Sequence, residues 1–483
     1  MAYLDCSPSI HVHNLFLEEK MTQSFNRRQF LKTAATAAGA LLVTSCAPQA
    51  TTAPTTAPAA TKAPTAAGAA ATTAPTAAPA AALKGKITCL FHGAASPMDV
   101  AYWATRIKMF TDAFPGVEFV ALGSANDEEF TQKVTTMVAG GTPPDLVKIS
   151  GGRLIATATK GIYEDLDPRI KASNLMTRIW KTLPGEGKEL RVCGKQYALP
   201  MDIEQRLWIY NQDLFDKMGV AYPKQDWTWE DLLAIGKGVS NPAENQYLVV
   251  PGTTSFQDYA DWVWEAGGSI FTEDGKHINL SEAPNVKAMQ YLVDLFKKYK
   301  YAPAPGLKLG DIGATFDTGK IAMSMAHTGT MASQLSKPTW KFKWSTVFAP
   351  KGPVNAQGFT KSNGWGIPKG TKSADLSWAF IEWWYSDAIQ TKFAEMGELV
   401  PRSDLRDTIA LKALPENLRP ALLQGSKNAR GLERFPGWDV GQRNWKNELD
   451  TAITGDVTVE AAMQTADKKA EVEITDVMAT ACQ

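Results

Sequence analysis

KITCLFHGAASPMDVAYWATRIKMFTDAFPGVEFVAL, residues 86–122, predicts a strand, a helix and a second strand in succession. The apolar run at 86–91 favours a buried strand that ends at His92-Gly93. Residues 98–114 place apolar side chains at helical spacing, and Pro115-Gly116 is a stop signal for that helix. The next residues are again a short apolar run, which favours the second strand.

The same alternation continues along the chain. Residues 128–138 have helical spacing, and residues 146–149 form another short apolar run. Strands that alternate with helices indicate a mostly parallel sheet covered on both faces. Ligands of such sheets bind at the carboxyl ends of the strands, which here carry His92, Ser150 and Gly151. A simple turn explains the glycines equally well.

Residues 1–46 have the features of an export segment. A paired arginine at 27–28 precedes a mildly apolar run and then Val-Thr-Ser-Cys, which ends at Cys46. The run is too short for a spanning helix, which needs about 20 apolar residues. The arginine pair resembles a twin-arginine signal, and Val-Thr-Ser-Cys resembles a bacterial lipobox. We expect an exported protein whose lipidated Cys46 anchors it to the membrane. Either Met1 or Met21 can be the true start.

Residues 47–83 consist almost entirely of Ala, Thr and Pro. Such a segment buries too little apolar surface to offset its chain entropy, so we expect a disordered linker. The linker would act as a tether between the anchor and a folded body. A glycosylated stalk also fits this composition.

Composition limits the possible partners. The chain carries 50 basic and 50 acidic residues, which argues against nucleic acid as a partner. Residues 84–483 are enough for two lobes with separate cores. The 15 tryptophans are either bulky core residues or flat platforms for a ligand with apolar faces. Cys89, inside the first strand, is expected to be a small buried residue.

Several short motifs then occur in order along the chain. They are Gly-Thr-Pro-Pro-Asp at 141–145, Gly-Lys-x-Tyr-x-Leu-Pro at 194–200, Tyr-Asn-x-Asp-Leu-Phe at 210–215, Trp-Thr-Trp-Glu-Asp-Leu at 227–232, Gly-Gly at 267–268, Thr-Gly-Lys-Ile-Ala-Met at 318–323 and Val-Pro-Arg at 400–402. Each motif is weak alone, but together they extend over nearly everything after the linker. Taken together they resemble one family, the bacterial extracellular solute-binding proteins of sugar-import ABC transporters.

This resemblance implies an α/β, two-lobed periplasmic-binding-protein type II fold. Each lobe would be a mostly parallel sheet flanked by helices, and the lobes would close on a ligand around hinge crossings. By resemblance the chain crosses near residues 201–205, returns near Val347 and crosses again near 395–401. Lobe I would then comprise residues 84–204 and 347–395, and lobe II residues 205–346 and 396–483.

The implied function is capture of a mono- or oligosaccharide and its delivery to an ABC permease. No catalysis, cofactor or metal is expected, and the protein is expected to be a monomer outside the cytoplasm. A sugar needs aromatic planes and paired hydrogen-bonding groups. The candidate ligand-binding residues are His92, Ser150, Gly151, Asp202, Glu204, Asp258, Tyr259, Trp262, Trp264, His327, Thr328, Trp365, Arg402 and Trp438.

Glu204 is the leading polar candidate, because its position resembles that of a ligand-contacting glutamate in maltose-binding relatives. The alternative is a hinge carboxylate satisfied by backbone N–H groups. Arg402 can contact hydroxyls, pair with Glu204 or form a purely structural ion pair. His327 and Thr328 would lie at the edge of the cleft, where the histidine is equally compatible with a structural role.

Four tryptophans carry separate expectations. Glycines flank Trp365, and we expect them to expose its indole for stacking. One of Trp262 and Trp264 should face the core and the other the cleft. Trp438 lies in an irregular segment, where a large aromatic often contacts a ligand.

Two other hypotheses remain open. An exported glycoside hydrolase also needs tryptophans and paired carboxylates. The same fold could instead bind glycerol phosphate or another polar solute, with Arg402 and His327 as anion contacts. Ser150-Gly151-Gly152 lacks the aromatic residue of maltose binders, so the identity of the ligand stays open.

Replacing Cys46 by Ser tests the anchor. Because the thiol is the only group in this motif that can carry the lipid, Cys46→Ser should move the protein from the membrane fraction to the soluble fraction. Fractionation followed by immunoblotting measures this. Retention in the membrane fraction would mean that another anchor exists.

Overall fold

A computed structural model describes residues 83–481, except for 253–254, 274, 305–309, 311–314 and 432–434. The expected export segment with Cys46, and the linker up to residue 82, lie outside the described residues. The described residues belong to one compact unit. Among the helices of this part of the chain, none combines the length and apolar character that a membrane crossing requires.

The sheet of lobe I has the strand order β2-β1-β3-β11-β6. Its first three strands pair in parallel, as the alternation of strands and helices predicts, whereas β11 is antiparallel to both β3 and β6. The strands are β1 (Gly85–His92), β2 (Val117–Ser124), β3 (Leu146–Ser150), β6 (Leu199–Pro200) and β11 (Asn363–Gly366). The helices that belong with this sheet are α2 (Ala101–Ala113), α3 (Asp127–Ala139), α4 (Gly151–Ala158), α5 (Asp167–Ala172), α6 (Asn174–Ile179), α12 (Ala374–Tyr385) and α13 (Asp387–Glu395).

The sheet of lobe II is built around β7, with the order β12-β10-β7-β8 and β9 also paired to β7. Strand β7 is antiparallel to β8, β9 and β10, and among the described strands of this lobe only β10 and β12 pair in parallel. The expectation of a mostly parallel sheet is therefore wrong for this lobe, because its neighbouring strands run against the long crossing strand. The strands are β7 (Glu204–Asn211), β8 (Met323–His327), β9 (Trp344–Val347), β10 (Gly358–Lys361) and β12 (Ala429–Gly431).

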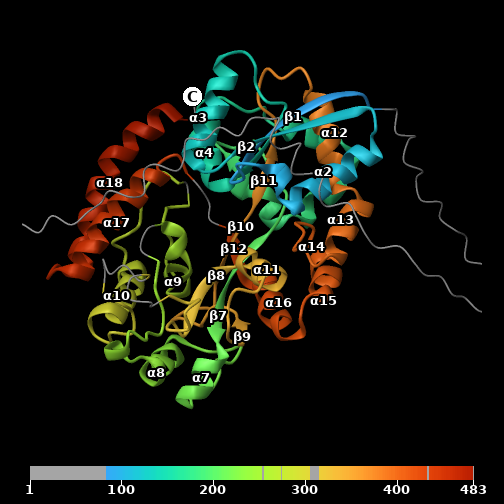
Figure 1. Ribbon diagram of the computed structural model, residues 1–483. Coiled ribbons are helices and arrows are strands. Elements are labelled where there is room, and N and C mark those ends of the chain that lie inside the picture. Colours follow the sequence, from blue (N-terminus) through green and yellow to red (C-terminus); the bar gives the residue numbers. More distant parts are fainter. Residues whose placement is uncertain are drawn as a thin grey trace, which may run out of the picture. The chain divides into compact units, whose positions relative to one another are not determined.

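Helices pack around this second sheet, and Figure 1 labels them together with its strands. They are α7 (Gln212–Met218), α8 (Trp229–Val239), α9 (Ala260–Glu265), α10 (Ala283–Lys297), α11 (Thr328–Ser336), α16 (Arg419–Asn428), α17 (Trp438–Thr454) and α18 (Val459–Ala481). The short helices α14 (Ser403–Leu405) and α15 (Leu411–Ala413) connect α13 to α16, and β4 (Arg191–Val192) forms a hairpin with β5 (Lys195–Gln196). The α/β class and the two sheet-containing lobes are confirmed.

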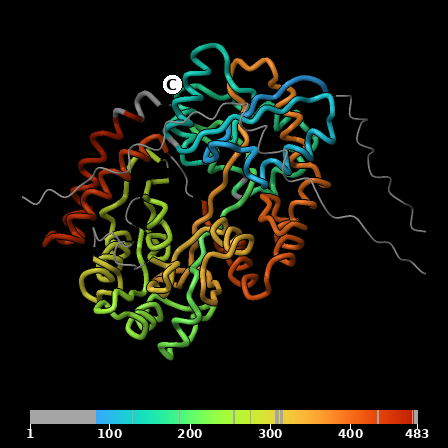
Figure 2. Tube along the Cα trace, viewed as in Figure 1, coloured from blue at the N-terminus to red at the C-terminus, as the bar shows by residue number. Residues whose placement is uncertain are grey.

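The chain passes between the lobes where β6 leads into β7 and where β10 leads into β11, and Figure 2 lets the reader follow both passages. The predicted return near Val347 is wrong, since β9 and β10 both pair with β7 and the return falls at Ser362. An extended segment has the same pattern in either lobe, so only its sheet partner decides the lobe. The last passage also lies later than predicted: Ala410 packs in the core of lobe I and Leu411 against β7 of lobe II.

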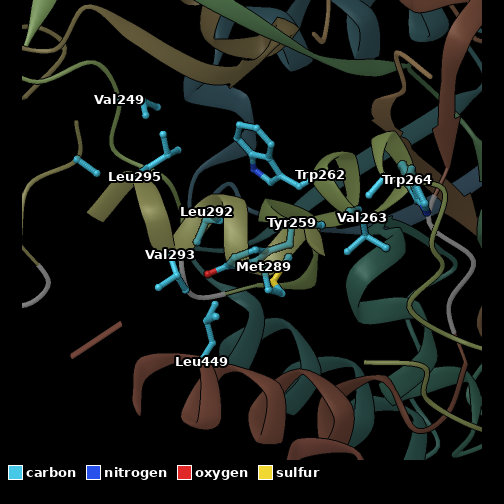
Figure 3. Packing of buried hydrophobic residues seen from close by; sticks show 14 of the residues in the cluster. Val249, Tyr259, Trp262, Val263, Trp264, Met289, Leu292, Val293, Leu295 and Leu449 are labelled. Carbon is cyan, nitrogen blue, oxygen red and sulfur yellow. The ribbon is translucent and has the colours of Figure 1, made fainter. Parts of the chain in front are cut away.

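Most of the tryptophans are core residues. Trp208, Trp262 and Trp445 are fully buried in lobe II, and Trp365 and Trp384 are fully buried in lobe I. Figure 3 shows the lobe II core, where Trp262 of α9 lies in the same cluster as Met289 and Leu292 of α10 and Leu449 of α17. Cys89 is fully buried in β1, as expected.

Helix α8 begins with the cap that its sequence predicts. Thr228 Oγ1 accepts a hydrogen bond from Asp231 N at 3.2 Å, and Asp231 Oδ2 accepts one from Thr228 N at 2.9 Å. Two N–H groups that the helix cannot satisfy internally are thereby paired.

Removing this cap should destabilise the protein. Thr228→Ala loses the hydroxyl acceptor, and the free energy of unfolding should fall by about 1 kcal/mol in urea denaturation. Thr228→Ser is the matched control, because it keeps the hydroxyl and should stay close to the wild-type value. Equal losses in the two variants would mean that the methyl contact, and not the cap, stabilises this helix.

Candidate functional site

Two carboxylates of the first crossing share one amide partner. Asp202 accepts hydrogen bonds from Asn363 N and from Asn363 Nδ2, both at 2.8 Å. Glu204 Oε1 accepts from the same Nδ2 at 3.3 Å, and Glu204 Oε2 lies 3.2 Å from Lys361 Nζ. Side chains alternate along an extended chain, so residues 202 and 204 face the same side. Backbone N–H groups alone therefore do not satisfy Glu204, because its partners are two side chains on the returning segment.

Burial sets the protonation of this cluster. Burial, together with the negative charge of Glu204, raises the pKa of Asp202 to about 6, against the opposing charge of Lys148 and the hydrogen bonds from Asn363. Burial also lowers the pKa of Lys148, and the charges of Asp202 and Glu204 oppose that change. The two lysines and two carboxylates thus form one group of half-buried, interacting charges at the junction of the lobes.

The carboxyl ends of β1 and β3 lie at this junction. Lys148 Nζ donates to His92 O at 3.2 Å, and Ser150 stands opposite Asn363 in the sheet register. Gly151 N donates to Ser362 O at 3.3 Å. The structure therefore brings His92, Ser150 and Gly151 beside the segment that holds Asp202, as the strand-end argument predicts.

Lobe II contributes the start of α11. Thr328 Oγ1 accepts from Gln205 N at 3.2 Å, and a Cβ placed on Gly329 would lie 3.8 Å from Glu204 Oε2. The first turn of α11 thus lies against Glu204. Burial, aided by the charges of Arg206 and Lys361, lowers the pKa of His327 to about 2, so this histidine is neutral.

Arg206 follows Glu204 on the same face of β7. Its guanidinium lies 3.6 Å from Asp261 and 3.9 Å from Asp258, and it sits over the Phe359 ring at 4.9 Å. Burial raises the pKa of Asp261 to about 7, against the opposing charge of Arg206. Asp258 therefore belongs to a charged network that extends the hinge cluster into lobe II.

Several aromatic candidates are placed in cores instead. Tyr259 and Trp262 are 1% exposed, and Trp438 is 4% exposed and stacks on Phe271. The expectation of a ligand contact at Trp438 rested on an irregular loop, but this residue is the first of helix α17. These three side chains fill the lobe II core and offer no free face to a ligand.

Trp365 corrects a specific expectation. Its indole is 1% exposed and contacts Phe380 and Trp384 edge to face, so the flanking glycines do not expose it. A Cβ on Gly364 would lie 2.7 Å from Leu190 Cδ1, and one on Gly366 would lie 2.9 Å from a backbone oxygen. The glycines permit close packing around the strand.

Trp264 differs from Trp262 in its surroundings. It is also buried, but the Arg430 guanidinium lies over its ring at 5.1 Å and Phe359 lies at 6.5 Å. Trp262 instead contacts Trp208 and Trp229. Of the pair, Trp264 is therefore the one directed toward the edge of the lobe II sheet.

Arg402 forms structural ion pairs, which was one of the three roles expected for it. Its guanidinium pairs with Asp404 at 2.6 Å and with Asp387, and its side chain is 5% exposed. It does not pair with Glu204.

Sequence reasoning missed Lys148, Arg206, Lys361 and Asn363. One of these had a signal, since Lys148 is a charged residue within the short, mainly apolar strand β3. Lys361 ends β10 and Asn363 begins β11, but in the sequence they belong to a polar stretch, residues 360–363, that looks like an ordinary turn. Within the described part of the chain, no group of three or more His, Cys, Asp or Glu residues is arranged to hold a metal ion.

A cavity of about 410 Å³ lies on the other side of the crossing strand. Ile203 and Gln205 line it, together with Thr360 of β10. Because Ile203 and Gln205 alternate with Asp202 and Glu204 along the chain, the cavity and the carboxylate cluster lie on opposite faces of the same segment.

The raised pKa of Asp202 has a consequence for stability. The native state holds this proton more tightly than the unfolded chain, so the contribution of Asp202 to stability falls as pH rises from about 4 to about 6. Asp202→Asn cannot titrate. Urea denaturation at each pH gives the unfolding free energy of the wild type and of Asp202→Asn. As pH rises from about 4 to about 6, the wild type should lose stability relative to Asp202→Asn.

Asp99→Asn, a change at an exposed aspartate outside the cluster, controls for the loss of one charge. If the difference in unfolding free energy between the wild type and Asp202→Asn stays constant from pH 4 to 6, the pKa of Asp202 is not raised.

Known proteins resemble this chain in sequence and in fold. The family described as bacterial extracellular solute-binding protein matches residues 94–391. The diacetylchitobiose binding protein DasA of Streptomyces coelicolor is 26% identical over 335 residues, which cover 67% of this chain and 74% of DasA. The mannitol-binding protein of Pseudomonas aeruginosa is 24% identical over 292 residues, which cover 58% of this chain and 65% of that protein.

Solved structures share the fold. An ABC substrate-binding protein of Listeria monocytogenes in complex with cycloalternan superposes with a TM-score of 0.68 at 23% identity, covering 82% of this chain and 99% of that one. The sugar-binding protein MalE of Xanthomonas citri gives a TM-score of 0.68 at 17% identity, covering 81% and 98%. Since the family match extends over more than half of its residues, this chain belongs to the bacterial extracellular solute-binding proteins.

Proposed function

We propose that this protein captures a sugar, a mono- or oligosaccharide, at the face of the hinge that carries Glu204 and delivers it to an ABC import permease. The observation that carries the proposal is that Asp202 and Glu204 share Asn363 at the junction of the lobes, where Glu204 also pairs with Lys361. A ligand bound there touches the segment through which the lobes move.

The chemistry of the cluster suits hydroxyl groups. A sugar hydroxyl both donates and accepts, and this cluster offers carboxylate acceptors next to an ammonium and an amide donor. A buried carboxylate left without its hydroxyl costs about 1–3 kcal/mol, which is how such a site would reject a ligand that lacks the matching group. The ion pair between Glu204 and Lys361 would open or be shared when the ligand binds.

A neutral ligand is favoured over glycerol phosphate. The anion hypothesis needs Arg402 and His327, but Arg402 is held by two aspartates and His327 is neutral. The relatives point the same way, because DasA is named for diacetylchitobiose and the Pseudomonas protein for mannitol. Both are uncharged polyhydroxylated molecules.

The rival reading as a glycoside hydrolase has little support. A hydrolase places its two carboxyl groups on either side of the scissile bond, about 5–10 Å apart. Here Asp202 and Glu204 accept from the same Nδ2 atom and face the same side of one strand. The members of the family named above are binding proteins.

We also propose that the lipid anchor at Cys46 holds a monomeric protein at the outer face of the membrane. This part rests on the sequence of residues 1–83 alone. A tethered binding protein stays close to its permease while its body rotates freely on the linker.

Glu204→Gln should weaken sugar binding roughly ten- to a hundredfold, because the amide cannot accept with both atoms and loses the pairing with Lys361. A thermal-shift screen of sugars, polyols and phosphate esters first finds the ligand, since a ligand at a hundred times its Kd adds about 2.7 kcal/mol of stability. Calorimetry with that ligand then gives the affinities of the variants.

The matched control is Glu244→Gln, at an exposed position on the surface of lobe II, which should bind as the wild type does. Unchanged affinity in Glu204→Gln would remove this residue from the site. Release of reducing sugar from the bound oligosaccharide would overturn the assignment as a binding protein.

A further inference from the structure

The tryptophans differ in how much of their surface the fold covers. Most are buried, and the half-buried ones are Trp103, Trp180, Trp340 and Trp344. Trp344 stands opposite Asn211 at the end of β7 remote from the hinge, and Trp340 contacts it edge to face. Trp180 packs against the 3-10 helix Pro184–Leu190. Trp103 of α2 differs from these three because its ring lies beside a lysine of the hinge.

The indole of Trp103 packs near the edge of the lobe I sheet that faces the hinge. Its ring centroid lies 5.0 Å from that of Phe91 and 6.1 Å from that of Trp365, and Lys148 Nζ lies 5.8 Å from it. Phe91, Lys148 and Trp365 stand opposite one another in neighbouring strands. Asn363 lies two residues before Trp365, on the same face of β11, and donates to both carboxylates of the cluster. Trp103 therefore packs on the row of side chains next to the one that holds the carboxylates.

Tyr102 fastens the start of α2 to the crossing segments. Its hydroxyl donates to Glu398 Oε2 at 3.1 Å, and the following carbonyl oxygen, of Leu399, accepts from Ile203 N of the first crossing at 3.0 Å. Burial, together with the charges of the two carboxylates in the cluster, raises the pKa of Tyr102 to about 12, against the opposing charge of Arg106. The first turn of α2 thus lies within electrostatic reach of the cluster, and Trp103 belongs to this turn.

Edge-to-face contacts hold the indole in place. The planes of Phe91, Tyr102 and Trp365 make angles of 63°, 81° and 78° with the plane of Trp103. Within the part of the chain that the structure describes, no aromatic ring lies flat on this indole. Trp103 is therefore a rigidly held, half-buried ring without a stacked partner, which is the arrangement that a flat apolar surface of a ligand requires.

We propose that Trp103 is the aromatic platform of the sugar site and that it selects a sugar in ring form over an open-chain polyol. This inference rests on the proposed function and narrows its ligand class. The carboxylates, the lysines and the amide of Asn363 can bind the hydroxyls of either kind of molecule. A sugar ring also presents a flat face of C–H groups that can pack on an indole, whereas an open chain has no such face.

The experiment compares each sugar with the alditol made by reducing it, which opens the ring and keeps the hydroxyl groups. The probes are D-glucose, D-mannose, D-galactose and N-acetyl-D-glucosamine, each with its alditol, and the oligosaccharide that binds in the thermal-shift screen. Calorimetry with the full-length protein gives the affinities. The wild type should bind the sugar of a pair at least about tenfold more tightly than its alditol, and Trp103→Ala should lose most of this preference.

Three further variants separate stacking from a purely structural role. Trp103→Phe keeps an aromatic ring against Phe91 and Trp365, and its preference for the ring form should lie between those of the wild type and Trp103→Ala. Glu204→Gln should weaken sugar and alditol by a similar factor, because it acts on hydroxyl groups. Trp340→Ala, the matched control, removes a half-buried indole of lobe II and should bind as the wild type does.

Two results would overturn the inference and leave the proposed function intact. One is a sugar that binds Trp103→Ala as tightly as the wild type, and the other is an equal loss of sugar and alditol affinity in that variant. If the wild type binds none of the sugars, polyols or oligosaccharides, the proposed function fails and this inference fails with it.

Discussion

The hydrogen bonds between the crossing segments are the constraint on which the rest of this structure depends. Met201 N donates to Asn363 O at 2.8 Å, Asn363 N donates back to Asp202, and Ile203 N donates to Leu399 O at 3.0 Å. Three passages of the chain, far apart in sequence, are thereby fastened side by side. Each lobe has its own sheet and core, and these bonds fix where one lobe can move against the other.

The alternation of side chains along the first crossing then produces two different surfaces. One face presents the carboxylates with their lysine and amide partners, and the other faces a cavity of about 410 Å³. The carboxylate face sits at the point of motion, so a ligand bound to it changes the balance between lobe arrangements by its differential affinity. A binding protein that must hold a solute and then release it needs this coupling between contact and motion.

The buried charges of the hinge carry a cost that their partners offset. Asp202 and Lys148 both lose hydration, and each shifts its pKa toward the neutral form. Charges held in this way are weak contributors to stability but hold hydrogen-bonding groups in place for a polar ligand. Aromatic side chains have the opposite role here, since most of the tryptophans fill the two cores and keep each lobe rigid.

Much of this protein follows from local sequence. The period of the apolar residues determined the first three strands and their helices, because a strand or an amphipathic helix buries its apolar side chains at a fixed spacing. The cap of α8 was readable for the same local reason, whereas Glu204 was singled out by its resemblance to a glutamate of the maltose-binding relatives. The sequence could not place the return at Ser362, the burial of Trp365 or the pairing of Glu204 with Lys361 and Asn363, since each depends on which distant segment packs alongside. Only the tertiary structure decided these, because a strand does not encode its partner and a glycine next to an indole permits either exposure or closer packing.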